Sequence, residues 1–229
     1  MTMTRATLLL TLCLGLAACG TGKPNSITAT LTGLKDQIAG AATQVLRGKP
    51  KPGNARASLN RALIDQYPKP LIFADLIKTG AGSAMEFQAQ NKSVRRYGAA
   101  DGSALALQNG LLVRTHGLTF DLVSADVNDL DRALRRGGSD NALRVHRYLD
   151  GENKEVTRSY VCSVSTLGHE RIVIFDVSHA TRHMVEDCQN GEITFQNHYW
   201  VGTRRGIIWR SQSWIGPDLG IIQIENLSR

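Results

Sequence analysis

The chain has 229 residues, of which 42% are hydrophobic and 21% charged, and its formal net charge is +7. A chain of this length and composition can bury a core of its own, and it suits one domain of ordinary size with small additions. After the N-terminus there is no run of about twenty apolar residues, which excludes a membrane-spanning helix from the rest of the chain.

Residues 1–18 have the features of an export signal. Arg5 is their only charged residue, and residues 6–16 form an apolar run that is short for a membrane span. The segment ends in LAACG (16–20), which resembles the lipobox of bacterial lipoproteins, where the cysteine is lipidated and becomes the first mature residue. We therefore predict a signal peptide over 1–18 and a lipid anchor, palmitate included, at Cys19. The alternative is an ordinary secreted protein in which Cys19 is incidental.

The predicted anchor places the protein in the cell envelope. Acyl chains on Cys19 would hold it at a membrane without a spanning helix, since each buried CH₂ contributes about 0.8 kcal/mol. Gly20 follows the cysteine, and by resemblance to enterobacterial sorting this favours the outer membrane, facing the periplasm. Export excludes nucleic acid as the partner of this basic chain. An anionic polymer or an acidic lipid surface would match its charge, and a basic surface without a partner is the alternative.

Two cysteines remain after Cys13 in the signal peptide and the anchor Cys19 are set aside. They are Cys162 and Cys188, and an even pair in an exported chain predicts a disulfide. Closing a loop of about 27 residues would add roughly 3–4 kcal/mol of stability. Two buried thiols and one half of a metal site are the alternatives.

Residues 19–57 are predicted to form a tether, an amphipathic helix and a linker. Apolar residues recur at steps of three and four from Ile27 to Leu46, which predicts a helix with one apolar stripe. The next stretch, RGKPKPGNARA (47–57), has the proline, glycine and charge of a linker. A second short helix is predicted over 58–66, because the prolines that follow at 68 and 70 would end it.

From residue 71 onward the pattern becomes that of β-strands. Strands are predicted over 71–78 and 85–90, and TGAGS (79–83) is interpreted as the turn between them. Two apolar strands flank Asn109-Gly110, a pair that tolerates the positive φ angles of a two-residue hairpin. A helix is predicted within SADVNDLDRALRRGG (124–138), capped by Ser124 or Asp126 and stopped by the two glycines.

The second half of the chain is predicted to be almost wholly β. A strand over 156–167 would point Cys162 inward, a continuous apolar strand over 171–177 would be central, and a short strand would cover 185–188. Three strands joined by tight turns close the chain. About nine to eleven mainly antiparallel strands predict a curled sheet, sandwich or barrel with a few short helices, as a single domain over 58–229.

Two stretches resemble the YjbF/GfcB family of bacterial lipoproteins. One is ALALQNGLLVRTHGLTFDLVSAD (104–126), and the other is CQNGEITFQNHYWVGTRRGIIWRSQSWIGPDLGIIQIENL (188–227). Within the second, the marks are Asn197, Tyr199 and Trp200, then the WRS and QSW triplets (209–214). The resemblance implies a barrel-like envelope lipoprotein that acts in exopolysaccharide or group 4 capsule production beside dedicated export proteins. It brings no catalytic motif.

The strongest pattern for catalysis or metal binding is FDVSHATRHMVEDC (175–188). His179 and His183 stand four apart among acidic residues, but the stretch lacks the glutamate of an HExxH zinc site. It is rich in turn-forming residues and is interpreted as irregular chain between strands. No G-x-S-x-G motif occurs. We therefore predict no metal, no cofactor and no catalytic residue.

Aromatic and basic residues gather near the C-terminus, in a pattern typical of a surface that binds glycan or a partner protein. Sugars stack on exposed aromatic rings, and neighbouring arginines suit an acidic glycan. The alternative is that most of the aromatic residues pack the barrel, because Trp209 and Trp214 stand five apart and would face opposite sides of a strand. The candidate surface comprises Tyr199, Trp200, Arg204, Arg205, Arg210 and Trp214.

The sequence thus predicts a lipoprotein with a non-enzymatic role in the assembly or secretion of exopolysaccharide or capsule. Its partners would be polysaccharide-export proteins or an anionic polysaccharide. One alternative is a lipid or lipoprotein carrier, which would need a hollow apolar interior. Another is a glycan-modifying enzyme, which would need a cleft with paired carboxylates or metal ligands.

Overall fold

A computed structural model of the chain describes residues 55–228. The predicted signal peptide, Cys19 and the helix predicted from Ile27 to Leu46 lie outside the described residues, as does most of the predicted linker. The helices within these residues are α2 (Arg61–Gln66) and α3 (Asn128–Arg136). The strands are β1 (Leu71–Leu76), β2 (Ala81–Asn91), β3 (Val94–Gly98), β4 (Ala104–Gln108), β5 (Leu111–His116), β6 (Ser124–Asp126), β7 (Ser139–Leu149), β8 (Glu155–Ile174), β9 (Val177–Gln189), β10 (Thr194–Gly202), β11 (Ile208–Gly216) and β12 (Gly220–Asn226).

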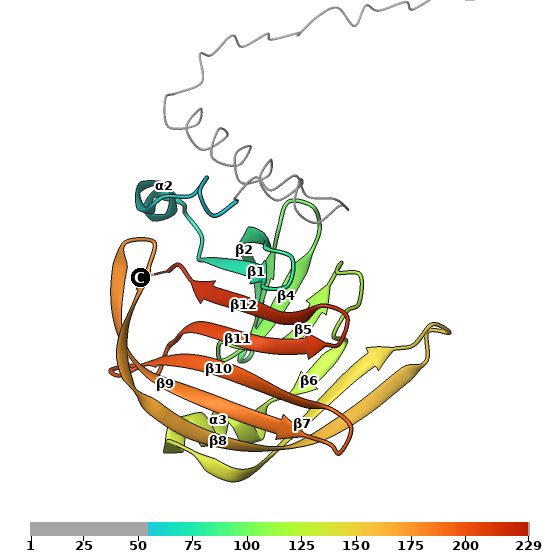
Figure 1. The fold of residues 1–229 in the computed structure, drawn as a ribbon. Helices are drawn as coiled ribbons and strands as arrows, with labels where there is room; N and C mark the ends of the chain where they lie inside the picture. The colour runs from blue at the N-terminus through green and yellow to red at the C-terminus, as the bar shows by residue number, and fades with distance from the viewer. Residues whose placement is uncertain (1–54, 229) are drawn as a thin grey trace, which may run out of the picture.

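All twelve strands belong to one antiparallel sheet, which confirms the predicted fold class. Their order is β5-β4-β3-β2-β1-β12-β11-β10-β9-β8-β7-β6. The sheet curls until its two edge strands approach each other, and the Thr115 amide on β5 donates to the Leu122 carbonyl just before β6 at 2.9 Å. The result is a nearly closed, barrel-like sheet (Figure 1).

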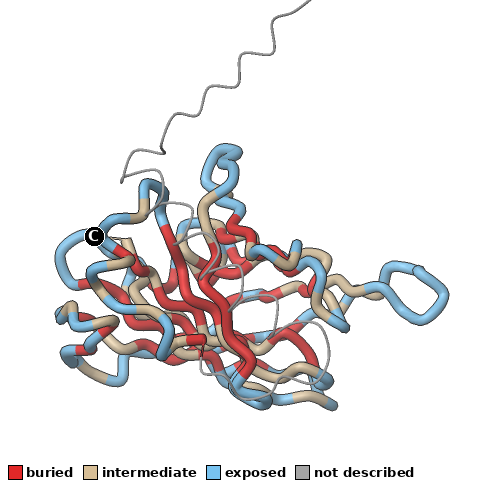
Figure 2. Tube along the Cα trace, turned by 90° about the horizontal axis from the view of Figure 1, so that it is seen from above, coloured by how far each residue is buried: buried red, intermediate tan, exposed pale blue. Residues whose placement is uncertain are grey.

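The main hydrophobic core fills the inside of this curled sheet. It takes inward residues from strands all round the sheet, together with the buried face of α3. Figure 2 shows the buried residues gathered in the middle of the molecule, with exposed turns around them. Large side chains with at most 1% exposure occupy the centre, among them Tyr160, Leu105, Leu111, Met184 and Tyr199. The interior is therefore filled by the protein's own side chains.

A second, smaller cluster covers the outer face of the sheet around β1 and β12. Ile64 of α2 packs there with Phe73 of β1 and with Ile174, near the tip of the β8–β9 hairpin. The Phe73 and Phe175 rings meet edge to face with their centroids 6.0 Å apart. Figure 1 shows this hairpin rising past β10 and β11 toward the C-terminus. The tip of a long hairpin thus seals the outer face that α2 begins to cover.

The local turn and helix predictions for the middle of the chain are confirmed. Asn109 and Gly110 have φ angles of +52° and +88° between β4 and β5, as a type I′ hairpin requires. Helix α3 lies within the predicted segment and ends at Gly137, with φ +94°. Asp126 accepts a hydrogen bond from the Asn128 amide at 3.0 Å, so it bonds the first turn of the helix from just outside it.

Two predicted features along the chain are wrong. The predicted turn at 79–83 ends at Gly80, and β2 already begins at Ala81. The predicted strand over 171–177 is broken, because Phe175 and Asp176 take positive φ angles and reverse the chain. The first difference arises because Gly82 lies within β2 and not in the turn, and the second because two non-glycine residues form the reversal.

The long hairpin β8–β9 replaces three predicted pieces. Residues 156–167 and 171–174 belong to one strand, β8, which continues past a register shift between Thr166 and Gly168. The stretch from Val177 to Gln189, expected to be largely irregular, is a regular strand paired along β8 and β10. Of the helices in residues 55–228, none combines the length and apolarity needed to cross a membrane.

Candidate functional site

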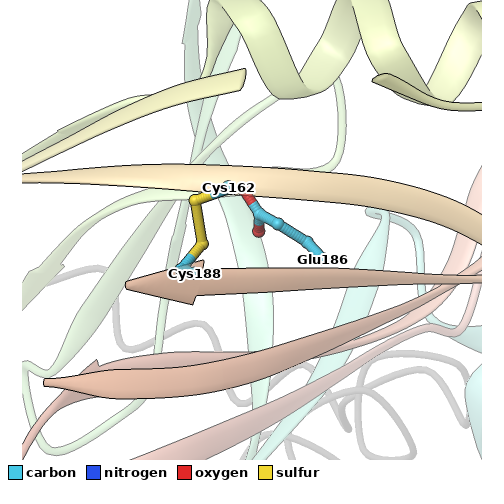
Figure 3. Close-up of side chains that lie close together, drawn as sticks. All are labelled: Cys162, Glu186 and Cys188. Atoms are coloured by element: carbon cyan, nitrogen blue, oxygen red, sulfur yellow. A yellow bond between two sulfur atoms is a disulfide. The ribbon is translucent and has the colours of Figure 1, made fainter. Parts of the chain in front are cut away.

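The disulfide predicted between Cys162 and Cys188 is present. The two cysteines face each other in register on β8 and β9, with their sulfurs bonded at 2.04 Å. Figure 3 shows the Glu186 carboxylate beside them, on the same side of β9 as Cys188. In residues 55–228 these three side chains are the group whose potential ligand atoms all lie within 4.8 Å. Both sulfurs are used in the disulfide, so the group offers no thiolate to a metal.

Glu186 forms a buried ion pair with Arg144 of β7. The exposed fractions of the two side chains are 0% and 4%, and the guanidinium binds both carboxylate oxygens, at 3.0 Å and 2.8 Å. Asn197 and Tyr199 of β10 also donate to Glu186 Oε2, at 2.7 Å and 3.0 Å. Burial lowers the pKa of Arg144, but the charge of Glu186, its hydrogen bonds and the neighbouring tyrosines together outweigh burial and raise the pKa above its ordinary value.

His146 extends this buried network toward the strand end. Its Nε2 lies 3.3 Å from Arg144 Nη1 and its Nδ1 lies 2.9 Å from the Tyr148 hydroxyl. The ring is 0% exposed. Burial first, and the positive charge of Arg144 second, lower the pKa of His146 from 6.5 to about 2. His146 is therefore neutral in the folded protein throughout the physiological pH range.

We expect acid to destabilise the wild-type protein through His146. The unfolded histidine binds a proton below about pH 6.5 and the folded one does not. The contribution of His146 to the free energy of unfolding is thus fully present above pH 6.5, and it is lost progressively as the pH falls from 6.5 toward 2. Between pH 7 and 4.5 wild type should lose about 2–3 kcal/mol more than His146→Gln, measured by urea unfolding. A substitution of the exposed His116 to Gln is the control, and parallel pH profiles for wild type and His146→Gln would contradict the assignment.

The aromatic residues of the closing meander divide between the two faces of the sheet. Trp214 stacks on Phe195, with ring centroids 4.4 Å apart, and both rings pack on the inner core. Trp200 is 8% exposed and belongs to the outer cluster, where its Nε1 donates to Glu170 Oε1 at 2.6 Å. Trp209 also joins the outer cluster. The expectation that Trp209 and Trp214 lie on different sides is therefore confirmed.

His179 and His183 each stack on a different tryptophan. The His179 and Trp209 ring centroids lie 3.8 Å apart, and those of His183 and Trp200 lie 4.4 Å apart. His183 Nδ1 also lies 2.9 Å from Glu170 Oε1. Because β9 is a strand, residues four apart lie on one face but far along it. The structure thus separates the histidines and gives each an aromatic partner.

The six residues predicted to form one surface do not come together as such. Tyr199 is 0% exposed and belongs to the buried network. Arg210 lies over the Trp200 ring at 5.4 Å and pairs with the buried Glu225 at 2.8 Å. Arg204 and Arg205 are exposed, in the turn between β10 and β11. Of the predicted set, this turn is the part that lies open to a ligand.

An open groove of about 420 Å³ lies beside that turn, on the outer side of the sheet. We call it the outer groove. It brings together the end of β8, the start of β9, and the turn between β10 and β11. Its lining residues are Arg171, Ser178, His179, Ala180, Gly202, Thr203, Arg204, Arg205, Ile207 and Trp209.

The outer groove is positively charged and has an aromatic wall. In residues 55–228 the guanidinium groups of Arg171, Arg204 and Arg205 form no hydrogen bond or ion pair with another side chain. No carboxylate occurs among the described lining residues. Trp209, stacked on His179, forms the apolar wall. Free arginines beside an aromatic ring suit a ligand with both negative charge and a flat apolar face, such as an acidic sugar chain.

Comparison with known proteins places this architecture in a family. The sequence matches a family described as group 4 capsule polysaccharide lipoprotein gfcB, YjbF, over residues 29–227. The chain belongs to the YjbF family. A solved structure with the YjbF fold is the hypothetical lipoprotein YmcC from Escherichia coli K12, with a TM-score of 0.67 and 17% identity, covering 91% of this chain and 98% of that one. At this identity the likeness shows the fold alone. No curated protein matches the sequence.

The sequence of this YjbF family member contained one unused indication of the buried network. Alternate residues of a strand share a face, so an inward Cys188 implies that Glu186 points inward as well. An inward glutamate needs a buried partner. Its partner Arg144 could not be found in this way, because 42 residues separate the two in the chain. Arg171 was missed for a similar reason, since it reaches the turn at Arg204 only through the fold.

Proposed function

We propose that this protein is an envelope lipoprotein that takes part, without catalysis, in assembling or secreting an anionic capsule or exopolysaccharide. The family supports a role connected with capsule polysaccharide. The observation that carries the proposal is the outer groove, which is lined by Trp209 and by three arginines without a side-chain partner among residues 55–228. The outer groove would bind the acidic glycan chain, and polysaccharide-export proteins would act with it. Attachment through Cys19 to the outer membrane, facing the periplasm, would place the groove on the route of export.

The alternatives have less support from the described residues. A carrier would need room for an acyl chain, whereas the inside of the sheet is filled by packed side chains and by the Arg144–Glu186 pair. A glycan-modifying enzyme of the usual kind would need paired carboxylates at its cleft. The outer groove has basic and aromatic walls and no carboxylate among its described lining residues. Binding is therefore the activity that this groove supports best.

Charge reversal in the outer groove should abolish the cellular role. In a strain that lacks the gene, we expect wild type to restore surface polysaccharide and the double substitution Arg171→Glu and Arg204→Glu to restore less than a tenth, because repulsion replaces about two charge-assisted contacts. Quantification of surface polysaccharide at equal protein level is the measurement. Lys154→Glu, at the exposed tip of the β7–β8 hairpin (Figure 1), is the matched control.

The outcomes of this experiment separate the parts of the proposal. Full restoration by the double variant would contradict glycan binding at the outer groove. Normal polysaccharide in the strain that lacks the gene would overturn the role itself. The same strain complemented with Cys19→Ala tests the anchor, because full restoration by that variant would show that lipidation is dispensable.

A further inference from the structure

A second pocket lies on the other side of the β10–β11 turn, at one open end of the barrel-like sheet. We call it the mouth pocket. Its volume is about 330 Å³, and it is bounded by the turns of the β2–β3, β4–β5 and β10–β11 hairpins and by the C-terminal end of α3. Arg205 and Ile207 line both the mouth pocket and the outer groove. A ligand that follows the outer groove over this turn therefore reaches the mouth pocket.

Ser211 contributes an unsatisfied hydroxyl to the mouth pocket. This residue of β11 is 1% exposed and lines the pocket. Its Oγ has no hydrogen-bond partner among the described residues. A buried hydroxyl without a partner is destabilising, and nearly all buried polar groups in folded proteins are hydrogen-bonded. Ser211 thus points to a bound polar group as its missing partner.

The mouth pocket is positively charged, which favours a negatively charged ligand. Arg95, Arg135 and Arg205 line the pocket, and none of its described lining residues carries a carboxylate. Arg95 donates to Gln90 Oε1 at 3.0 Å, and Arg135 pairs with Asp131, which lies outside the lining, at 3.1 Å. Arg205 has no such partner in the described part of the chain. Arg95 and Arg205 thus keep two positive charges that no carboxylate of the described lining balances, and a negatively charged group on a ligand would compensate part of this excess.

The remaining walls favour a ring with hydroxyl groups over a bare anion. Tyr97, Leu107 and Ile224 provide apolar surface, while the side chains of Asn109 and Asn226 supply amide donors and acceptors. A volume of about 330 Å³ is at the small end of ligand pockets. A sugar ring has apolar C–H faces and a rim of hydroxyls, and a carboxyl substituent adds the charge. The C–H faces would contact the apolar walls, the hydroxyls would bond the amides, and the carboxyl group would pair with an arginine.

We propose that the mouth pocket binds one acidic hexose unit, with its carboxylate at Arg205 and a ring hydroxyl at Ser211. The inference rests on the proposed function, since the unit would belong to the same anionic chain that occupies the outer groove. Arg205 stands at the crossing between the two sites. The mouth pocket would thereby select the polysaccharide by its charged sugar, while the outer groove holds the chain beside it.

The test uses the purified full-length lipoprotein in detergent micelles and monosaccharide probes. Titration with D-glucuronate, followed by ¹H–¹⁵N NMR, should shift the Ser211 amide and the Arg205 side-chain signals, and D-glucose should bind at least tenfold more weakly. Ser211→Ala should weaken glucuronate binding about threefold to tenfold and Arg205→Gln about tenfold or more. Ser83→Ala, a buried serine on β2 that already donates to the Ala84 carbonyl, is the matched control and should leave binding unchanged.

The outcomes distinguish this inference from the proposed function. Unchanged glucuronate binding by folded Ser211→Ala, with thermal unfolding as in wild type, would overturn the mouth pocket. Inorganic phosphate binding as tightly as glucuronate would overturn the assignment to a sugar. Neither result would alter the cellular effect of Arg171→Glu and Arg204→Glu, since those residues lie outside the mouth pocket. If the double variant Arg171→Glu and Arg204→Glu instead restored surface polysaccharide fully, the proposed function would be contradicted, while the monosaccharide result would still stand.

Discussion

Replacing Glu186 by alanine is expected to lower the free energy of unfolding by about 3–5 kcal/mol. The substitution leaves the Arg144 guanidinium in the core without its counter-ion, because that side chain is 4% exposed and both of its bonds to a carboxylate go to Glu186. It also removes the acceptor used by Asn197 and Tyr199. Since domains of this size are stable by only about 5–15 kcal/mol, urea unfolding followed by circular dichroism should show a large loss.

The matched control is a solvent-exposed Arg–Glu pair that joins the neighbouring strands β7 and β8. Arg147 and Glu155 pair at 3.3 Å with side-chain exposures of 40% and 55%. Glu155→Ala should cost less than about 1 kcal/mol. If Glu186→Ala does not fold, the double variant Arg144→Met with Glu186→Leu remains informative. Removing both charges should recover most of the lost stability, and a double variant as unstable as Glu186→Ala would contradict this account of the pair.

Removing the disulfide is expected to lower stability by about 2–5 kcal/mol. The bond joins Cys162 and Cys188 across a sequence separation of 26 residues. It lowers the conformational entropy of the unfolded chain and thereby stabilises the folded state. The double variant Cys162→Ala with Cys188→Ala should unfold at correspondingly lower urea. Adding reductant should shift wild type in the same direction and leave the variant unchanged. Equal midpoints for wild type and variant would contradict a stabilising role.

The disulfide and the buried ion pair should also depend on each other. Cys188 and Glu186 lie two residues apart on β9, and their side chains face the same interior (Figure 3). Side chains that share surroundings rarely contribute additively, with coupling energies of about 0.5–3 kcal/mol. The bond holds β9 at a fixed register beside β8, and this register places Glu186 within reach of Arg144. Reductant should therefore destabilise wild type more than the double variant Arg144→Met with Glu186→Leu.

The location of the buried network bears on how the grooves keep their shape. Arg144, Glu186 and Tyr199 join β7, β9 and β10 inside the sheet. The turn that carries Arg204 and Arg205 follows directly from β10. A rigid interior beneath β10 thus supports a ligand-binding turn above it, as functional loops are commonly held by a rigid scaffold. The buried network thus helps to hold the turn that lines the outer groove in place.

Local features of the fold could be predicted from the sequence alone. The hairpin at Asn109-Gly110 and helix α3 depend on residues that lie within a few positions of one another, where backbone preference decides the outcome. The pairing of Cys162 with Cys188 followed from counting the cysteines of an exported chain. The YjbF family followed from the motifs of two stretches, and with it came the barrel-like fold. The prediction of Cys19 as lipid anchor also rests on local sequence.

The tertiary structure alone decided which side chains meet. Alternation along a strand tells which residues share a face, but each register shift changes the phase, and the shifts at Thr166–Gly168 and Trp200–Val201 are not visible in the sequence. Tyr199, a member of the candidate surface, lies in the core, as the alternative of aromatic residues packing the barrel predicts for it. Arg144 and Glu186, or Arg171 and Arg204, come together only because the sheet curls and its long hairpin folds across the outer face. The sequence by itself determined the family, the type of fold and its local turns, whereas the grooves and the buried charges depend on contacts between distant strands.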